Sequence, residues 1–401
     1  MAGHQSPPLP KRLLHVVDSL APAAGGTTEG IRKLAESSAG VSGAEVVCLD
    51  DPGEPYLRGQ SFPVHALGPA QGNYRYTPRL GEWLEQNLAR FDGVVIHGLW
   101  QYHSYGSYRV ARGRLPYVVF PHGMLDPYFK RAFPLKHLKK QVYWLMREYR
   151  VLRDAKAVCF TTPIERDSAA GTMWPQRWNT AVVSFGTTQP PGDPSSQRGI
   201  FLSRYPALRQ RRFFLFLSRI HSKKGCDLLL AALARVAEAH PDLDLVMAGP
   251  DEGGLRPQLE EQAGRLGISA RVHWTGMLEG DLKWGAFHAA DAFVLPSHQE
   301  NFGVAVVEAL ACGVPVLISD KVNIWPDIVH DAAGIVNPDT AEGTYRSMTT
   351  LLGMQGEERR RMVSNGLACF RARYEMGRTA QALNELFSDT FRIPGLPGLP
   401  T

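Results

Sequence analysis

Residues 296–316 read PSHQENFGVAVVEALACGVPV, a pattern of loop, helix, glycine stop and strand. The apolar residues after Gly303 recur at helical spacing and predict a helix that begins there, and Gly313 can end it in a left-handed conformation. Because the first N–H groups of a helix have no partner inside it, they can cradle an anionic or polar ligand. This segment is therefore a candidate ligand site.

Glu300 and Glu308 lie near the start of the predicted helix, the second about one and a half turns inside it. A carboxylate offers two acceptor oxygens, which suits the vicinal hydroxyls of a ribose for Glu308 and those of a sugar for Glu300. Taken alone, the pair is also consistent with a surface acid and a helix acid that bind nothing.

A basic loop follows the apolar run that ends at Leu217, where residues 218–225 read SRIHSKKG and lead into a helical pattern. Arg219 presents a planar fork of donors and Lys224 a compact charge, so together they could hold a diphosphate and stabilise its departure. A solvated basic loop is the alternative for both residues.

Short apolar runs alternate with longer helical patterns along the chain, as is typical of parallel α/β sheets. The runs are Leu13–Val17, Val46–Leu49, Val94–Ile96, Tyr117–Phe120, Val158–Phe160, Phe213–Leu217, Leu243–Met247, Val272–Trp274, Ala292–Leu295 and Val314–Ile318.

The prolines and glycines of residues 189–199 interrupt this alternation, and we expect that segment to lie outside helices and sheets. The fold class predicted is α/β, with doubly wound domains at 1–190 and 191–401 and the last helix as a candidate to cross back to the first. Two such domains leave a cleft at the carboxyl ends of their strands, where ligands bind. One long α/β domain is the alternative.

Glycines and histidines follow strands in the first half. Gly25 and Gly26 precede a helical pattern and allow close approach to a ligand, or form an ordinary tight turn. Their spacing is not the dinucleotide-binding fingerprint. His122 and His97 stand at the carboxyl ends of two predicted strands, where each could be structural or functional, and His15 is expected to contribute packing inside its strand.

Together, these features resemble retaining glycosyltransferase family 4, a group of nucleotide-sugar-dependent enzymes whose GT-B architecture has two Rossmann-like domains facing across a cleft. The resemblance covers roughly Leu13 to Leu386 and is strongest in the E-x7-E pair Glu300 and Glu308, in residues 218–225 and in residues 309–315. It implies that Arg219 and Lys224 contact the donor diphosphate, Glu300 the sugar hydroxyls and Glu308 the ribose.

The same resemblance assigns roles to further residues. The backbone of Asn301, Phe302 and Gly303 would meet the donor sugar or phosphate. In the first half, Gly25 and Gly26 would close over the donor phosphate, and His122 would touch the sugar near its reacting carbon. His97 is a further candidate on the acceptor side. The catalytic set implied is His122, Glu300, Lys224 and Arg219.

Residues 130–156 combine nine Lys and Arg with interleaved aromatic and apolar residues. Such a basic, aromatic segment is typical of a face for a membrane surface or an anionic ligand, or of a solvated helix that covers the sheet. Asp242-Leu243-Asp244 spells D-x-D but stands at the start of a predicted strand, opposite the ligand edge, so we interpret its aspartates as polar residues at the protein surface. We expect no metal and no cofactor.

The chain has 401 residues, 44% of them hydrophobic, a globular composition that excludes disorder as the main state. Its net charge of +5 is too mild for a dedicated nucleic-acid binder, and no nucleic-acid partner is expected. The five widely spaced cysteines include no C-x-x-C and indicate neither a disulfide framework nor a zinc site. They favour a reducing compartment.

No stretch approaches the roughly 18 to 20 continuous apolar residues of a membrane span, and residues 1–10 lack the apolar core of a signal peptide. We therefore expect a soluble, cytoplasmic protein whose membrane contact, if any, is peripheral. The first ten residues and the tail from Ile393 to Thr401 are expected to be loose ends.

The resemblance implies a retaining transfer of a hexose from a nucleoside diphosphate sugar to a hydroxyl of a glycan acceptor, in bacterial polysaccharide or glycoconjugate synthesis. Both a free glycan and a lipid-linked glycan stay open as the acceptor. Both UDP and GDP stay open as the donor nucleotide. Two alternatives are a nucleotide-sugar 2-epimerase of the same architecture and a non-catalytic module that binds anionic lipid or nucleic acid through residues 130–156.

Overall fold

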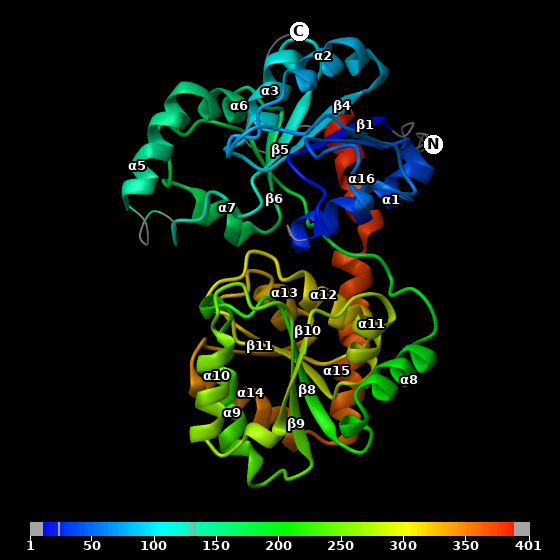
Figure 1. Cartoon of the computed structure of the whole chain (residues 1–401), viewed down its shortest axis with the longest axis vertical. Helices are drawn as coiled ribbons and strands as arrows, with labels where there is room; N and C mark the ends of the chain where they lie inside the picture. The colour runs from blue at the N-terminus through cyan, green and yellow to red at the C-terminus, as the bar shows by residue number, and fades with distance from the viewer. Residues whose placement is uncertain (1–10, 23–24, 129, 131–133, 389–401) are drawn as a thin grey trace, which may run out of the picture. The chain divides into compact units, whose positions relative to one another are not determined.

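The computed structural model describes residues 11–388 apart from 23, 24, 129 and 131–133, and Figure 1 shows the course of the chain. The chain forms two compact units. One takes the described residues up to Thr188 together with those from Met376 onwards, and the other runs from Gln189 to Glu375. The expected loose ends, and Phe129, Arg131 and Phe133 of the basic segment, lie outside the described residues.

The first unit is built on a seven-stranded parallel sheet in the order β3-β2-β1-β4-β5-β6-β7. Its strands are β1 (Leu13–Val17), β2 (Glu45–Cys48), β3 (Val64–Ala66), β4 (Gly93–His97), β5 (Tyr117–Phe120), β6 (Ala157–Phe160) and β7 (Thr180–Val182). Its helices are α1 (Gly26–Ser42), α2 (Pro78–Asn87), α3 (Tyr102–Ala111), α5 (Pro134–Tyr143), α6 (Tyr149–Arg153), α7 (Pro163–Ala169) and α16 (Met376–Phe387), with a π-helical turn at Trp144–Glu148 and 3-10 turns at Pro55–Leu57 and Leu88–Arg90.

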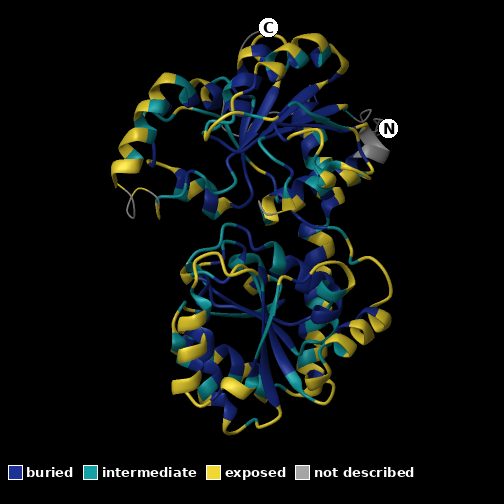
Figure 2. Cartoon of the chain, viewed as in Figure 1, coloured by how far each residue is buried: buried dark blue, intermediate teal, exposed yellow. Residues whose placement is uncertain are grey.

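Helices cover both faces of this sheet, so alternate residues of each central strand pack into different cores. Leu14 and Val94 belong to the core under α2, α3 and α6, whereas Val95 and Val118 belong to the core under α1 and α16. Burial on both faces explains why the central strands read as continuous apolar runs, and these strands are dark blue in Figure 2.

The second unit has a six-stranded parallel sheet in the order β10-β9-β8-β11-β12-β13. Its strands are β8 (Arg212–Leu217), β9 (Leu243–Ala248), β10 (Val272–Gly276), β11 (Ala292–Leu295), β12 (Val316–Ser319) and β13 (Gly334–Asn337). Its helices are α8 (Pro194–Arg204), α9 (Cys226–Ala237), α10 (Arg256–Arg265), α11 (Gly280–Ala289), α12 (Val304–Ala311), α13 (Trp325–His330), α14 (Ala341–Gly353) and α15 (Gly356–Cys369), with a π-helical turn at Phe370–Tyr374 and 3-10 turns at Pro206–Leu208, Ser222–Lys224 and Ser269–Arg271.

Each sheet reverses its strand order once, between β1 and β4 in the first unit and between β8 and β11 in the second. In open α/β sheets, ligands bind outside the carboxyl ends of the strands at this switch point. The predicted Rossmann-like α/β class is confirmed for both units. The loops after β1, β4, β8 and β11 are therefore the places to look for function.

The apolar runs of the sequence did not predict three of the strands, β3, β7 and β13. All three lie at an edge of their sheet, and none contains a fully buried residue. A strand at an edge can leave side chains in solvent, so it does not produce a continuous apolar run.

The expected linker between residues 189 and 199 is partly helical, which corrects the prediction. Helix α8 begins at Pro194, and the Asp193 carboxylate accepts a hydrogen bond from the N–H of Ser196 at 2.7 Å. Proline is tolerated in the first turn of a helix, where its missing N–H has no partner in any case, and aspartate is a favourable N-cap. Pro194 therefore marks a helix start.

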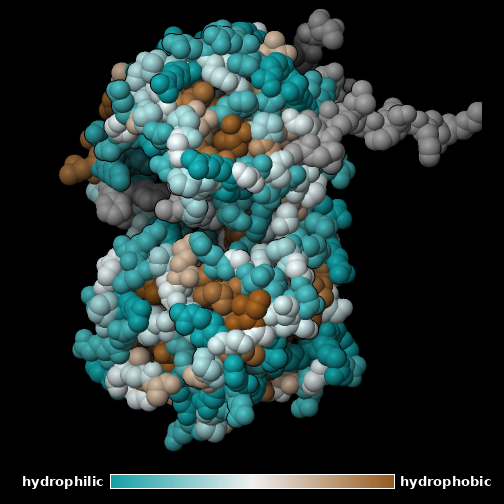
Figure 3. Space-filling model, turned by 45° about the vertical axis from the view of Figure 1, so that its right-hand side comes forward, coloured by the Kyte–Doolittle hydropathy of each residue, from teal (hydrophilic) through white to brown (hydrophobic). Residues whose placement is uncertain are grey.

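Most of the surface visible in Figure 3 is hydrophilic, with hydrophobic patches on each unit. Among residues 11–388 as described, no helix combines the length and the apolarity needed to cross a bilayer.

Candidate functional site

An ion pair joins two loops at the carboxyl edge of the second sheet. Lys224, in the loop after β8, contacts the Glu300 carboxylate in the loop after β11, and their side chains are 11% and 19% exposed. The structure thus brings together two residues that the sequence analysis assigned to different parts of one ligand. At a switch point, a largely buried lysine can bind a phosphate group, and a largely buried carboxylate can accept hydrogen bonds from a hydroxyl group.

Backbone contacts hold these two loops against each other. The N–H of His298 donates to the carbonyl of Lys223 at 2.8 Å. Gly225 has a φ of +65°, and a Cβ there would lie 2.1 Å from the carbonyl oxygen of Pro296. Only glycine combines this left-handed conformation with so close an approach. Its place between Lys224 and α9 therefore lets the basic loop reach the acidic one.

Helix α12 starts directly after the acidic loop, as the sequence predicts. Gly303 is its N-cap with a φ of +83° and offers no side chain to the first N–H groups. At the other end, the N–H groups of Gly313 and Val314 donate to the carbonyls of Leu310 and Ala309 at 3.0 and 2.9 Å. This is the Schellman arrangement that a left-handed glycine allows. Helix α12 is thus capped by its backbone at the carboxyl end, whereas its amino end has no side-chain cap at Gly303.

The loop before α12 is anchored through its backbone and through Phe302. The N–H of Glu300 donates to the carbonyl of Lys321 at 2.9 Å, in the loop after β12. The Phe302 ring is 6% exposed and packs edge-on against Tyr374 at 5.6 Å. Asn301 between them is half-buried. Since Phe302 points into the core, only its backbone is available to a ligand.

Glu308 pairs with a lysine that the sequence analysis missed. Its carboxylate lies 2.7 Å from Nζ of Lys283 on α11, and the two side chains are 3% and 18% exposed. A buried carboxylate is costly without a compensating charge, so Lys283 explains how Glu308 can face inwards. No local pattern links the two residues, which lie 25 positions apart.

Arg219 is placed differently from Lys224. Its guanidinium lies 2.7 Å from the Glu252 carboxylate in the loop after β9, with side-chain exposures of 55% and 38%. Such an exposed pair contributes little stability, so Arg219 can change partner at low cost. Between the two cations, burial and the charge of Arg219 lower the pKa of His221.

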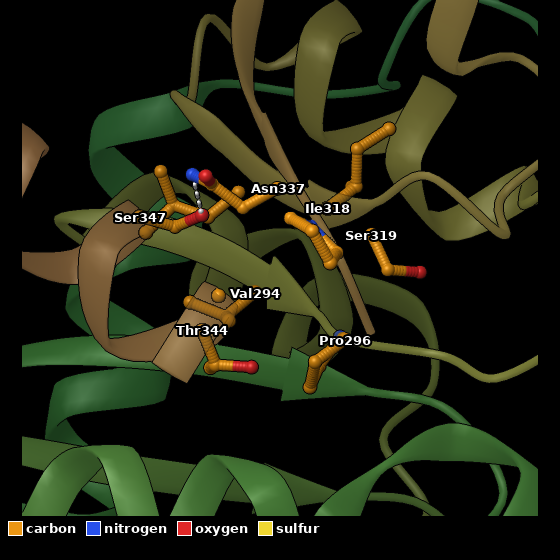
Figure 4. Close-up of a pocket in the computed structure, with 10 residues that line it drawn as sticks. Val294, Pro296, Ile318, Ser319, Asn337, Thr344 and Ser347 are labelled. Atoms are coloured by element: carbon orange, nitrogen blue, oxygen red, sulfur yellow. Dashed lines mark hydrogen bonds between the residues drawn. The ribbon is translucent and has the colours of Figure 1, made fainter. Parts of the chain in front are cut away.

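A small pocket lies at the carboxyl ends of β11, β12 and β13 (Figure 4). Its empty volume is about 190 Å³, and Pro296, Ser319 and Asn337 are among its lining residues. The amide of Asn337 donates to Ser347 Oγ at 2.9 Å, which closes one side of the pocket. Pro296 stands at the start of the loop that carries Glu300, so the pocket adjoins the candidate site.

In the first unit, the paired glycines form the start of α1. Gly25 is the N-cap, with a φ of +85° that favours glycine, and its N–H donates to the carbonyl of Pro22 at 3.0 Å. Gly26 is the first helical residue and is exposed. The amino end of α1 therefore coincides with the glycine pair.

His122 follows β5 and is held in a left-handed conformation with a φ of +49°. Its Nε2 lies 3.0 Å from Nδ1 of His97, and Nε2 of His97 lies 2.9 Å from Nδ1 of His15. His97 is 2% exposed and uses both ring nitrogens in these contacts. His97 is therefore enclosed by its neighbours, and its role on the acceptor side stays a prediction. His15 makes a hydrogen bond to His97 in addition to packing inside its strand.

A second group, Glu165, holds the turn that carries His122. It accepts hydrogen bonds from the N–H of Gly123 and from the N–H of Thr161, both at 2.7 Å. The pattern Thr162-x-x-Glu165 predicts a capping box, and Thr162 does cap α7. The glutamate side chain nevertheless turns to Thr161 and Gly123, a use that the local pattern does not reveal.

The D-x-D sequence lies at the amino end of β9, as expected. Asp244 is paired with Arg211 and lies 2.8 Å from Nε2 of His273, so its oxygens are already engaged. Within the described part of the chain, no three His, Cys, Asp or Glu side chains gather closely enough to hold a metal ion.

Residues 203–368 match the family described as Glycosyl transferases group 1, and residues 25–186 match the family described as Glycosyl transferase 4-like domain. Together these matches span most of the chain.

Several characterised and uncharacterised proteins are similar in sequence. An uncharacterized glycosyltransferase of Methanocaldococcus jannaschii is 34% identical over 133 residues, 32% of this chain and 33% of that protein. A D-inositol 3-phosphate glycosyltransferase of Segniliparus rotundus is 36% identical over 38% of this chain and 34% of its own. The chain thus aligns with about a third of each. A protein of the same description from Streptomyces bingchenggensis is 26% identical over 78% of this chain and 70% of its own.

Two solved structures share the fold. The Anabaena protein HepE, in complex with UDP and glucose, superposes with a TM-score of 0.73 at 19% identity, covering 94% of this chain and 100% of that one. A sucrose-phosphate synthase from Thermosynechococcus elongatus also gives 0.73 at 19% identity, covering 94% and 98%.

Proposed function

The chain belongs to the glycosyltransferases of GT-B architecture, with a glycosyl transferase 4-like domain in its first half and a glycosyl transferases group 1 domain in its second. We propose that it is a retaining hexosyltransferase. The donor is a nucleoside diphosphate sugar, and the acceptor is a hydroxyl of a glycan. The observation that carries this proposal is the Lys224–Glu300 pair beside the amino end of α12.

Departure of the nucleoside diphosphate is the step that the second unit supports. Lys224 and the first N–H groups of α12 would stabilise the charge that develops on the leaving phosphate, and Arg219 would turn from Glu252 to add a bidentate contact. The sugar passes through an oxocarbenium-like transition state. The acceptor then attacks from the face that the diphosphate leaves, and a phosphate oxygen takes the acceptor proton.

The two acidic residues would hold the donor's hydroxyl groups. When Lys224 moves its charge to a phosphate, the Glu300 carboxylate is free to accept hydrogen bonds from the sugar. Glu308, already tied to Lys283, would accept from the ribose with its remaining capacity. The ion pairs thus orient these carboxylates before the donor arrives.

The first unit would contribute Gly25, Gly26 and His122. His122 would hydrogen-bond the sugar near its reacting carbon, and the amino end of α1 would meet the donor phosphate. The complexes of HepE with UDP and UDP-glucose support uridine donors as the first to test. GDP sugars are the second class.

A surface on α5 supports a lipid-linked acceptor and peripheral contact with an anionic membrane, as in bacterial polysaccharide or glycoconjugate synthesis. Leu135, Leu138 and Val142 lie on one helical stripe and are 84%, 63% and 53% exposed. The stripe continues into Leu145, and residues 134–147 contain no acidic residue. An apolar stripe flanked by lysines is the pattern of a helix that lies on an anionic lipid surface.

A panel of UDP and GDP sugars tests the donor. We expect one of them to raise the melting temperature, because a ligand that binds only the folded state stabilises it. The same sugar should then be transferred to a glycan acceptor with retention of the anomeric configuration, measured by NMR of the product. A panel in which no nucleotide sugar stabilises or reacts would contradict the proposal.

Incubation of the donor without acceptor separates the transferase from a 2-epimerase of the same architecture. A transferase hydrolyses the donor slowly at most, whereas an epimerase changes the sugar. A binding module for anionic lipid or nucleic acid would instead ignore nucleotide sugars and show steep salt dependence. The ion-paired Glu300, Glu308 and Lys224, of which Glu308 and Lys224 are buried, argue for the transferase, because a lipid-binding surface does not require them.

A further inference from the structure

A row of three imidazole rings runs from the interior of the first unit to His122. His15 lies in the middle of β1, His97 ends β4 and His122 follows β5, and these three strands are neighbours in the sheet. Their facing ring nitrogens are 2.9 and 3.0 Å apart. Successive ring planes are inclined by only 16° and 15°. The register of adjacent parallel strands therefore builds a continuous hydrogen-bonded row.

The row is enclosed by apolar neighbours. His15 and His97 are 0% and 2% exposed, Phe120 stacks on His97, and the Phe185 ring stands edge-on to both His97 and His122. Burial lowers the pKa of His15 to about 4 and that of His122 to about 3, and lowers that of His97 well below its usual value. All three rings are consequently neutral near pH 7.

A neutral imidazole has one nitrogen that donates and one that accepts. With two hydrogen bonds between three neutral rings, only two placements of the ring protons are consistent, and we call them the first and the second setting. In the first, Nδ1 of His15 donates to His97, Nδ1 of His97 donates to His122, and His122 keeps its proton on Nδ1. In the second, every proton lies on Nε2, and His122 presents a bare Nδ1.

The inner end of the row selects between these settings. Nε2 of His15 is buried and has no hydrogen-bond partner among the described residues. In the second setting this atom would carry an N–H without an acceptor, whereas in the first it carries only a lone pair. An imidazole N–H that is buried without an acceptor loses its hydrogen bond to water with no replacement, and buried backbone N–H groups are likewise rarely found without a partner. The first setting is therefore favoured.

We propose that His97 and His15 are positioning residues that fix the ring and the proton of His122, so that His122 presents an N–H at Nδ1 to an oxygen of the bound sugar or phosphate. This inference rests on the proposed function for the identity of the ligand. It assigns His122 the role of a hydrogen-bond donor rather than a general base, because a ring whose outer nitrogen is protonated and whose inner one accepts from His97 has no site for a further proton.

The protonation state can be measured without substrate. In protein labelled with 15N-histidine, we expect the His122 resonances, assigned by their loss in His122→Gln, to show a protonated Nδ1 and an unprotonated Nε2. His97→Phe keeps an aromatic ring in the stack and removes both hydrogen bonds, so it should return His122 to a mixture of tautomers. A wild-type spectrum with the proton of His122 on Nε2 would overturn the proposal.

Kinetics test the consequence for turnover. We expect His97→Phe to lower kcat by about 10- to 100-fold while the donor KM changes by less than about 3-fold, since misplacement of a contact group chiefly costs transition-state stabilisation. His15→Asn, whose amide can replace the Nδ1 donor, should retain more activity than His15→Leu. His65→Phe, on β3 and outside the row, is the control, and melting temperatures check the fold of each variant.

Unchanged kcat in His97→Phe would overturn the positioning role. The two experiments also separate this inference from the proposed function. If no nucleotide sugar is turned over by the wild type, the proposed function fails, while the NMR result still decides the tautomer. If His122→Gln is inactive and His97→Phe is fully active, the proposed function stands and the positioning role fails.

Discussion

Lys224 and Glu300 form an ion pair although they lie 76 residues apart in the sequence and on loops that follow different strands. Each of these loops starts beside the switch point of the second sheet. Neither side chain is more than 19% exposed, so removal of either charge would leave the other buried without an opposite charge unless a ligand took its place. Under the proposed function, a nucleotide sugar would replace this contact when it binds.

Replacement of Lys224 tests the role of the pair in turnover. We expect Lys224→Ala to lower kcat/KM by roughly 10²- to 10³-fold, since one preformed charge opposite the leaving group is lost. Unfolding in urea should show a loss of about 1–3 kcal/mol, because Glu300 is left without its partner. Lys223→Ala, at the neighbouring position, is the control. Wild-type turnover in Lys224→Ala would remove the basis of the proposed mechanism.

The Glu308–Lys283 pair predicts a different kinetic signature. Glu308→Gln should raise the donor KM by about tenfold and change kcat little, because a contact to the ribose is made equally in the ground state and the transition state. Glu342→Gln, which alters an exposed pair with Arg235, should leave both constants unchanged. The role of Glu308 would have to be abandoned if its variant bound the donor like the wild type.

Glu148 makes the stability of the first unit depend on pH. This carboxyl is buried and accepts hydrogen bonds from the N–H of Trp100 at 3.0 Å and from Ser104 Oγ at 2.9 Å. Burial raises its pKa from 4.5 to about 7 against the opposing effect of these bonds. The folded state therefore holds the proton more tightly than the unfolded state does.

The stability that this proton contributes is fully present below about pH 4.5 and is lost as the pH rises through about 7. We expect the wild type to lose roughly 2–3 kcal/mol relative to Glu148→Gln between about pH 5 and pH 8, measured as the difference in free energy of unfolding. Equal pH profiles for the two proteins would contradict the assignment.

Gly225 and Gly254 provide a matched pair for the contact between the loops. Both have left-handed backbone conformations, with φ of +65° and +63°, but only at Gly225 would a Cβ approach a backbone carbonyl, that of Pro296. Gly254→Ala should cost about 1–2 kcal/mol from its conformation. Gly225→Ala should cost clearly more in the same urea titration and should also lower turnover. Similar losses at both positions would mean that the loops can separate freely.

The stripe on α5 predicts binding to anionic vesicles. Leu135→Ser and Leu138→Ser should each weaken binding to phosphatidylglycerol vesicles by about tenfold, because each removes one leucine from the inserted face. Leu266→Ser changes a comparably apolar residue of the second unit, which is 39% exposed, and should have no effect. Binding should also weaken with added salt. Equal vesicle binding by all of these proteins would exclude the stripe as a membrane contact.

The central strands could be read from the sequence because their cause is local. Runs such as Tyr117–Phe120 and Ala292–Leu295 are apolar throughout, since strands buried on both faces need no alternation, and the structure has strands with these bounds. The edge strands β3, β7 and β13 lack that signal. The start of α8 at Pro194 does have a local signal, because Asp193 directly before it caps the helix, but the prolines and glycines around it favour a loop over the whole segment.

Glu300, Lys224 and Glu308 could be singled out from residue type and from their places after strands and at a helix start, all of which are properties of short segments. Their partners could not. Lys283 pairs with Glu308, Glu252 pairs with Arg219, and the histidine row joins His15 to His97. These contacts link positions 25 to 82 residues apart and depend on the order in which the strands and helices are arranged. Residue patterns report burial and chain direction along one segment, whereas a hydrogen bond between segments exists only once the sheet has set them side by side.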